Sequence, residues 1–156
     1  MKLKASIDYG VRAIVYLAIK GGTCSSREIS DEMCVPRDYL IQLALRMRNA
    51  GLIKARPGKN GGYVLAKDPD DITIGMVLNA FDSDLKHVRQ PMKKDSKASE
   101  SAQIVRKAHG IVTKSFNCYL DSITVKDIID ATDDDANPNE ILAAAFDAEA
   151  ERLRSE

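Results

Sequence analysis

The chain has 156 residues, 44% of them hydrophobic, and its 23 basic side chains balance its 23 acidic ones. This length predicts one globular domain with an added helix or two. No stretch approaches the roughly 20 consecutive apolar residues that span a bilayer, and the N-terminus lacks the features of a signal peptide, so we expect a cytoplasmic protein.

The charge is distributed unevenly along the chain. Residues 1–68 contain 12 Lys and Arg against 6 Asp and Glu, a net charge of +6. Residues 69–156 contain 11 against 17, a net charge of −6. A basic half beside an acidic half indicates a polyanion-binding module joined to a segment with another role.

Three helices are predicted in the first fifty residues. The first covers 6–19, where apolar residues recur at helical spacing, and it ends at Gly21. Ser25 or Ser26 can cap a short second helix, and a longer third helix opens near Pro36. We expect the third helix to run to residue 50 with an apolar side formed by Tyr39, Leu40, Leu43, Leu45, Met47 and Ala50. A short helix, a tight turn and a longer helix form the helix-turn-helix plan.

Two short strands are predicted directly after this motif. They cover 52–56 and 63–65 and enclose the glycine-rich turn 57–62. Glycines permit a tight tip with positive φ and a close approach of the backbone to a phosphate, and Arg56 and Lys59 add positive charge. A basic turn of this kind after a helix-turn-helix predicts a wing, and therefore a mainly α winged-helix domain that binds duplex DNA.

The second half predicts a long helix with a wide apolar stripe. Thr73 is expected to cap a helix that ends at Phe81, and the polar stretch 83–99 is interpreted as a mobile loop. The long helix then covers 101–120. Because a compact domain that already has a core cannot bury a second side of this helix, we expect a second copy of the chain to cover it. The candidate interface residues are Ile104, Ala108, Ile111, Val112, Ser115 and Tyr119.

The end of the chain contains one further capping signal. Thr124 and Asp127 predict a capping box for a short helix over 125–131. The segment 122–125 is similar to 71–74, which we interpret as a shared capping pattern and not as an internal repeat. The predicted divisions are a winged helix-turn-helix domain (1–81), a flexible loop (82–100), the dimerisation and short helices (101–131), and an acidic linker with an Ala-rich helix (132–156).

The candidate DNA contacts fall into two groups. Base contacts are expected from the third helix, because Gln pairs with adenine and Arg with guanine in the major groove, although an ordinary solvated face is the alternative. These candidates are Arg37, Asp38, Gln42 and Arg46. The candidates for phosphate contacts, which position the protein without reading sequence, are Ser26, Arg27, Tyr39, Lys59 and Asn60.

Several of these motifs together resemble the Rrf2 family of bacterial winged-helix regulators over about residues 1–131. They are Met1-Lys2-Leu3, Asp8-Tyr9-Gly10, 29–43 in the helix-turn-helix, 48–53, the wing 58–65 and 121–125. The resemblance implies a homodimer held by the long helix, with two recognition helices on a roughly palindromic operator. It also implies a transcriptional regulator, more often a repressor than an activator.

The chain departs from the family pattern at two places. Many members place an arginine directly before the wing glycine, whereas here that position is Pro57 and Arg56 is the candidate substitute. Cluster-bearing members have three cysteines in the loop before the long helix, and 83–99 contains none, so we expect no iron–sulfur cluster and no other cofactor.

Three further side chains are weighed as metal ligands. Asp8 matches a carboxylate ligand of some members, but an acid in a first helical turn is the favoured interpretation. His87 and His109 are interpreted as surface or packing residues, so no metal site is predicted.

The three cysteines are candidate sensor thiols. Cys24, Cys34 and Cys118 are too widely spaced for a disulfide framework or a CxxC site. Cys24 is the best candidate, because a thiol in an exposed loop before a helix start has a lowered pKa. The alternative for each is a small buried apolar residue.

These patterns together predict a homodimeric DNA-binding repressor whose signal is redox, a metal or cluster, or a metabolite. The alternative is a winged-helix module that binds proteins and never touches DNA. An enzyme is not expected, since the sequence shows no nucleophile motif, phosphate loop or His-rich metal spacing.

Overall fold

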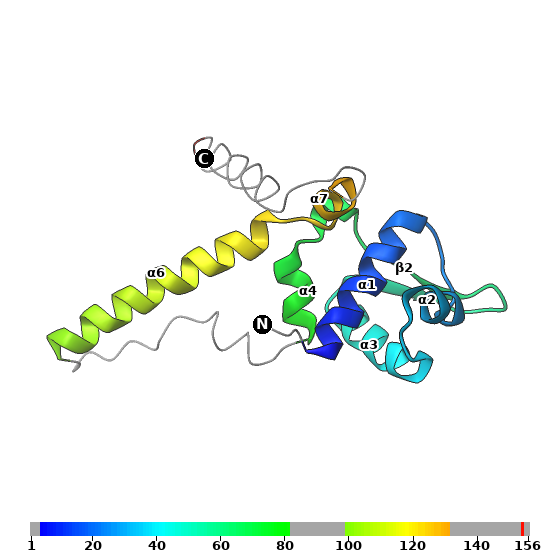
Figure 1. The fold of residues 1–156 in the computed structure, drawn as a ribbon, viewed down its shortest axis with the longest axis horizontal. Coiled ribbons are helices and arrows are strands. Elements are labelled where there is room, and N and C mark those ends of the chain that lie inside the picture. The colour runs from blue at the N-terminus through cyan, green and yellow to red at the C-terminus, as the bar shows by residue number, and fades with distance from the viewer. Residues whose placement is uncertain (1–3, 82–98, 132–153, 155–156) are drawn as a thin grey trace.

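The computed structural model describes residues 4–81, 99–131 and 154. A compact group of helices carries a two-stranded hairpin at one side, and a long helix extends away from it at the other (Figure 1). The elements are α1 (Ala5–Lys20), α2 (Ser26–Met33), α3 (Arg37–Asn49), β1 (Ile53–Arg56), β2 (Gly62–Leu65), the 3-10 helix η1 (Pro69–Asp71), α4 (Ile74–Phe81), α6 (Glu100–Ser122) and α7 (Val125–Asp130). This confirms the predicted mainly α fold with a small wing.

Short-range signals set the ends of the helices, as the sequence predicts. Ser25, Thr73 and Thr124 each accept a hydrogen bond from the backbone N–H three residues later, at 3.1–3.2 Å. Thr124 also forms the predicted capping box with Asp127. α1 ends at Gly21, whose φ of 66° lies in the left-handed region.

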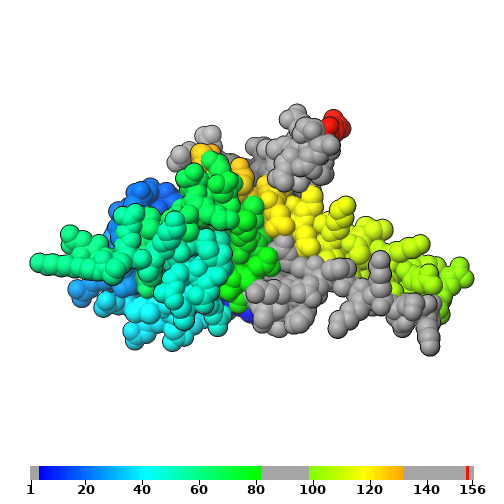
Figure 2. All heavy atoms as spheres, turned by 180° about the vertical axis from the view of Figure 1, so that it is seen from behind, coloured from blue at the N-terminus to red at the C-terminus, as the bar shows by residue number. Residues whose placement is uncertain are grey.

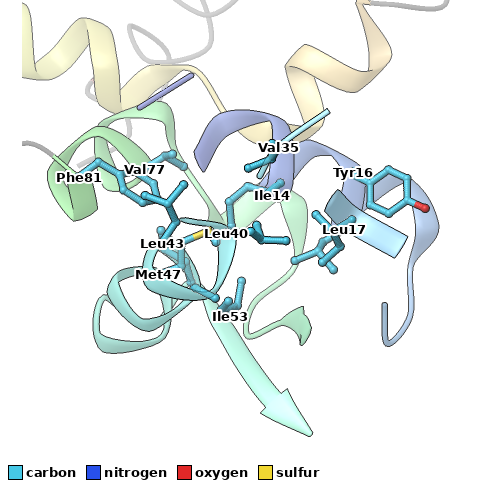
Figure 3. Packing of buried hydrophobic residues seen from close by; sticks show 14 of the residues in the cluster. Ile14, Tyr16, Leu17, Val35, Leu40, Leu43, Met47, Ile53, Val77 and Phe81 are labelled. Carbon is cyan, nitrogen blue, oxygen red and sulfur yellow. The ribbon is translucent and has the colours of Figure 1, made fainter. Parts of the chain in front are cut away.

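The core forms around α1. Ile14 of α1 and Leu40 of α3 are fully buried, and Val77 of α4 lies in the same cluster (Figure 3). α1 and α4 pack closely at Gly10, where a Cβ atom would lie 2.1 Å from the Phe81 ring. α3 contacts both α1 and α4, and the hairpin contacts α1 and α3. This packing therefore fixes the positions of α3 and the hairpin relative to α1.

The segment after the long helix returns to this core. The backbone N–H of Ile74 donates to the carbonyl oxygen of Ile123 at 2.9 Å, and that of Val125 donates to Ile72 at 2.8 Å. Val125 is fully buried in the core cluster. The two similar segments of the sequence therefore pair with each other. α7 packs on α1 and η1. The predicted division of the chain into domains stays a prediction.

Among the described residues, α6 is buried against the body in its C-terminal half. Thr113 and Leu120 are buried and α6 packs against α4, whereas the N-terminal end of the helix lies far from the other helices (Figures 1 and 2). The loop and the final helix predicted at either side, within 82–98 and 132–153, lie outside the described residues. No helix in the described parts of the chain is both long and apolar enough to span a membrane.

Candidate nucleic-acid interface

The turn between α2 and α3 is held by a small set of local contacts. Cys34 ends α2 with a φ of 52°, the left-handed conformation that reverses the chain direction. The Ser30 hydroxyl donates to the carbonyl oxygen of Val35 at 2.7 Å, and Val35 is buried. α2 is also connected to α1, since the Tyr16 hydroxyl donates to the Glu28 carboxylate at 3.0 Å. These contacts give α3 a fixed orientation on the domain surface.

α3 has one buried face and one exposed face. Leu40, Leu43, Ala44 and Met47 are buried against the core. The residues on the opposite side are exposed: Arg37, Asp38, Ile41, Gln42, Leu45, Arg48 and Asn49. The prediction that Leu45 and Ala50 join the apolar side was wrong, because Leu45 is 50% exposed and Ala50 is exposed as well. Leu45 is two residues from both Leu43 and Met47, which places it about 200° around the helix from each.

The wing and the helix-turn-helix together enclose a hollow. β1 and β2 form an antiparallel hairpin in which Arg56 pairs with Gly62. A hollow of about 410 Å³ lies between this hairpin and the starts of α2 and α3. It is lined by Ser25, Ser26, Arg37, Ala55, Arg56, Pro57, Gly58, Lys59, Gly61, Gly62 and Tyr63.

This wing hollow is positively charged. Its lining contains the cations Arg37, Arg56 and Lys59 and no Asp or Glu. The Arg37 Nε atom donates to the Ser26 hydroxyl at 3.3 Å, which directs that guanidinium toward the start of α2. Hydroxyl and cationic groups at a helix start are groups that bind a phosphate, so the hollow suits the backbone of a nucleic acid. Arg56 lies in it although Pro57 occupies the usual arginine position.

The remaining candidate DNA contacts lie elsewhere on the surface. Arg27, Asp38, Gln42 and Asn60 are exposed but do not line the wing hollow. Arg46 lies on the side of α3 that points away from the wing hollow. It lines a second hollow of about 410 Å³ together with Asn49, Ala50, Met76, Asn79 and Ala80.

Tyr39 lies on the side of α3 that faces α1. It is half-buried, and its ring meets the Tyr9 ring edge-on at 5.9 Å between centroids. A phosphate contact by Tyr39 remains a prediction.

A family model described as an iron-dependent transcriptional regulator, Rrf2, matches residues 3–131. The chain belongs to the Rrf2 family. The family consists of transcriptional regulators, which supports a DNA-binding function for the helix-turn-helix and wing. The predicted resemblance is therefore confirmed.

Individual relatives match over most of their length. The HTH-type transcriptional regulator CymR of Bacillus subtilis is 30% identical over 135 residues, which cover 85% of this chain and 93% of CymR. The HTH-type transcriptional regulator slr0846 of Synechocystis is 33% identical over 132 residues, which cover 82% of this chain and 87% of slr0846. Among solved structures, IscR of T. potens matches with a TM-score of 0.63 and 31% identity, over 85% of this chain and 88% of IscR. The structure of B. subtilis CymR, a global cysteine regulator, matches with a TM-score of 0.60 and 28% identity, over 82% of this chain and 95% of that chain.

The donors in the described part of this Rrf2 protein do not form a set of three thiolates that would hold an iron–sulfur cluster. Within 4–81 and 99–131, no three His, Cys, Asp or Glu side chains come close enough together to hold a metal. Asp8 forms an ion pair with Arg12 at 2.8 Å, as a first-turn acid would, and His109 lies 3.4 Å from the Thr113 hydroxyl. The sequence of 82–98 contains no cysteine. The absence of a cofactor stays a prediction.

The structure corrects the prediction for Cys24. Its backbone pairs with Tyr63 of β2 through two hydrogen bonds, of 2.8 and 2.9 Å, so the loop before α2 joins the wing as a third extended segment. Cys24 is consequently 2% exposed, and burial raises the pKa of its thiol, the opposite of the lowered pKa that an exposed loop would give. Cys34 is exposed and Cys118 is half-buried.

Proposed function

We propose that this chain is a homodimeric repressor that inserts α3 into the major groove of duplex DNA and binds the adjacent backbone phosphates in the wing hollow. The observation that carries the proposal is the set of three cations, Arg37, Arg56 and Lys59, brought together beside the exposed face of α3. The cations match the phosphate backbone, and the exposed face of α3 can meet the base edges of the same DNA. A dimer that occupies promoter DNA in the cytoplasm hinders polymerase, which favours repression.

The dimer part of the proposal rests on α6. Four aliphatic residues of this helix are between 59% and 68% exposed: Ile104, Val105, Ile111 and Val112. Ala108, Ser115 and Tyr119 share this face at helical spacing, and Phe116 is exposed at its edge. Because Thr113 and Leu120 face the body, the apolar side of α6 faces outward, where the same face of a second copy is the simplest cover.

The experiment is a band-shift titration against fragments of the organism's own genome, in salt from about 50 to 200 mM. We expect binding to weaken linearly on a logarithmic scale as salt increases, since each neutralised phosphate releases counterions. Lys59→Ala should weaken binding to all fragments alike and lower the salt slope by about one. Lys114→Ala, which removes an exposed cation from α6, should leave the slope unchanged.

The alternative is a winged-helix module that binds only proteins. It predicts no binding to any genomic fragment even in dilute salt. A band shift with the expected salt slope excludes it, and the absence of any shift overturns the proposed function.

A further inference from the structure

The exposed face of α3 contains two aliphatic side chains that the core does not use. Ile41 is 45% exposed and Leu45 is 50% exposed. They are four residues apart on the helix, so they lie side by side, with Cβ atoms about 5–6 Å apart. Four other residues of α3 are buried in the core. Core packing therefore does not account for two large aliphatic side chains on the exposed face.

Charged and polar groups border this aliphatic pair. At 100° per residue, Arg37 and Arg48 lie along one side of the pair, and Asp38, Gln42 and Asn49 lie along the other. Arg37 also lines the wing hollow, which places the pair next to the candidate phosphate site. Two side chains supply far less than the roughly 800 Å² per partner of a stable protein interface. The two cations on one side, one of them in the wing hollow, instead match a polyanion, and Asp38, Gln42 and Asn49 on the other side offer polar groups to base edges.

We propose that Ile41 and Leu45 read thymine through its 5-methyl group in the major groove. This inference rests on the proposed function and names the base that the recognition helix selects. The thymine methyl is the apolar group that base edges present in the major groove, and cytosine has a hydrogen atom at that position. Contact with a methyl group removes both apolar surfaces from water, whereas contact with a polar base edge would leave its donors or acceptors without partners.

The spacing of the pair predicts the spacing of the thymines. A separation of about 5–6 Å on the helix corresponds to one or two steps of about 3.4 Å along one DNA strand. Each half-site should therefore contain two thymines, adjacent or separated by one base pair, opposite the middle of α3. Gln42 is free to pair with an adenine beside them.

The test removes the methyl groups one at a time. Preferred duplexes are first selected from a random pool, and each thymine is then replaced by deoxyuridine, which keeps the pairing with adenine and deletes only the methyl. We expect the wild-type chain to lose about fourfold in affinity at each of two positions per half-site, the loss that corresponds to one buried methyl-sized group. Replacements elsewhere should have no effect.

Protein variants then assign each methyl to a side chain. Ile41→Ala should bind the thymine and deoxyuridine duplexes equally at one of the two positions, and Leu45→Ala should do so at the other. Ile19→Ala is the matched control, because Ile19 is 61% exposed but lies at the end of α1. It should keep the full wild-type sensitivity at both positions.

The outcomes separate this inference from the proposed function. If the chain binds DNA with the expected salt slope but no thymine replacement changes its affinity, methyl recognition is wrong and DNA binding stands. If both alanine variants keep the wild-type sensitivity, the methyl groups contact other residues and the inference is overturned. If no duplex binds at any salt concentration, both proposals fail.

Discussion

Cys24 and Cys34 flank α2, ten residues apart, but lie in opposite environments. Cys24 is buried beneath the wing, with its thiol directed to the carbonyl oxygen of Gly22 at 3.9 Å, while Cys34 is exposed in the turn before α3. Burial raises the pKa of the Cys24 thiol, so less of it is present as the reactive thiolate near neutral pH. An oxidant that reaches the folded protein therefore meets Cys34 before Cys24.

Thiol alkylation at about pH 7.5 checks this difference. We expect iodoacetamide to modify Cys34 faster than Cys24 by on the order of tenfold or more, because modification of Cys24 requires the wing contact to open. Peptide mapping by mass spectrometry measures the two rates, and denatured protein serves as the reference in which the rates should converge. Equal rates in the folded protein would contradict the buried position of Cys24.

At the scale of the elements, the wing depends on one close contact with the loop before α2. Gly62 begins β2, and a Cβ atom there would lie 2.1 Å from the Cys24 carbonyl oxygen. The sequence predicts that wing glycines allow a close approach to phosphate, but at Gly62 the close approach is to the protein's own backbone. Gly58, with a φ of 117°, supplies the positive φ that was predicted for the tip.

Gly62→Ala should therefore loosen the wing. We expect a loss of about 1–3 kcal/mol in the free energy of unfolding, because the methyl group forces two backbone segments apart. The matched control is Gly22→Ala, where a Cβ atom meets nothing within 4 Å and where a change within about 0.5 kcal/mol is expected. Urea unfolding followed by circular dichroism compares the two variants, and similar midpoints would refute the close contact.

α6 is the second element whose role is testable. Ile111→Glu places a carboxylate on its exposed apolar face, midway along the helix, where a second copy would bury it without a partner. We expect the dissociation constant of the dimer to rise by more than about 100-fold, since burial of an unpaired charge costs several kcal/mol. Sedimentation equilibrium measures the constant.

Gln103→Glu is the control for this substitution. It adds the same charge on the same helix but outside the apolar face. It should dimerise like the wild type. A monomeric wild-type chain, or an Ile111→Glu variant that dimerises normally, would exclude α6 as the interface.

At the scale of the whole molecule, the wing and α6 lie on opposite sides of the domain (Figure 1). Pairing through α6 would hold two copies of α3 and the wing hollow at a fixed separation. Dimers of this kind bind half-sites whose centres are one helical turn of DNA apart, or a multiple of it, because only then do both recognition helices meet the same face of the duplex.

Insertion of about 5 base pairs between the half-sites tests this geometry. The insertion turns one half-site by half a helical turn, so we expect affinity to fall toward that of a single half-site. Insertion of about 10 base pairs restores the helical phase and should restore more of the affinity than the shorter insertion does. An affinity that does not change with the number of inserted base pairs would indicate two monomers that bind independently.

Local signals in the sequence were sufficient to predict most of the elements. The caps Ser25, Thr73 and Thr124 act within three residues, and apolar spacing within a helix shows which residues recur on one face. The helix-turn-helix, the wing and the long helix follow from such patterns. The family resemblance also came from the sequence, because its motifs are short runs of adjacent residues.

The tertiary structure decided which partner each face meets. The return of α7 to the core depends on pairing between Ile72 and Val125, more than fifty residues apart, and the burial of Cys24 depends on Tyr63. The outward position of Ile41 and Leu45 likewise depends on how α3 packs against α1 and α4. Helical periodicity gives the relative angles of side chains, but only the packed neighbours determine which angle points to water, and so which residues of α3 are free to meet DNA.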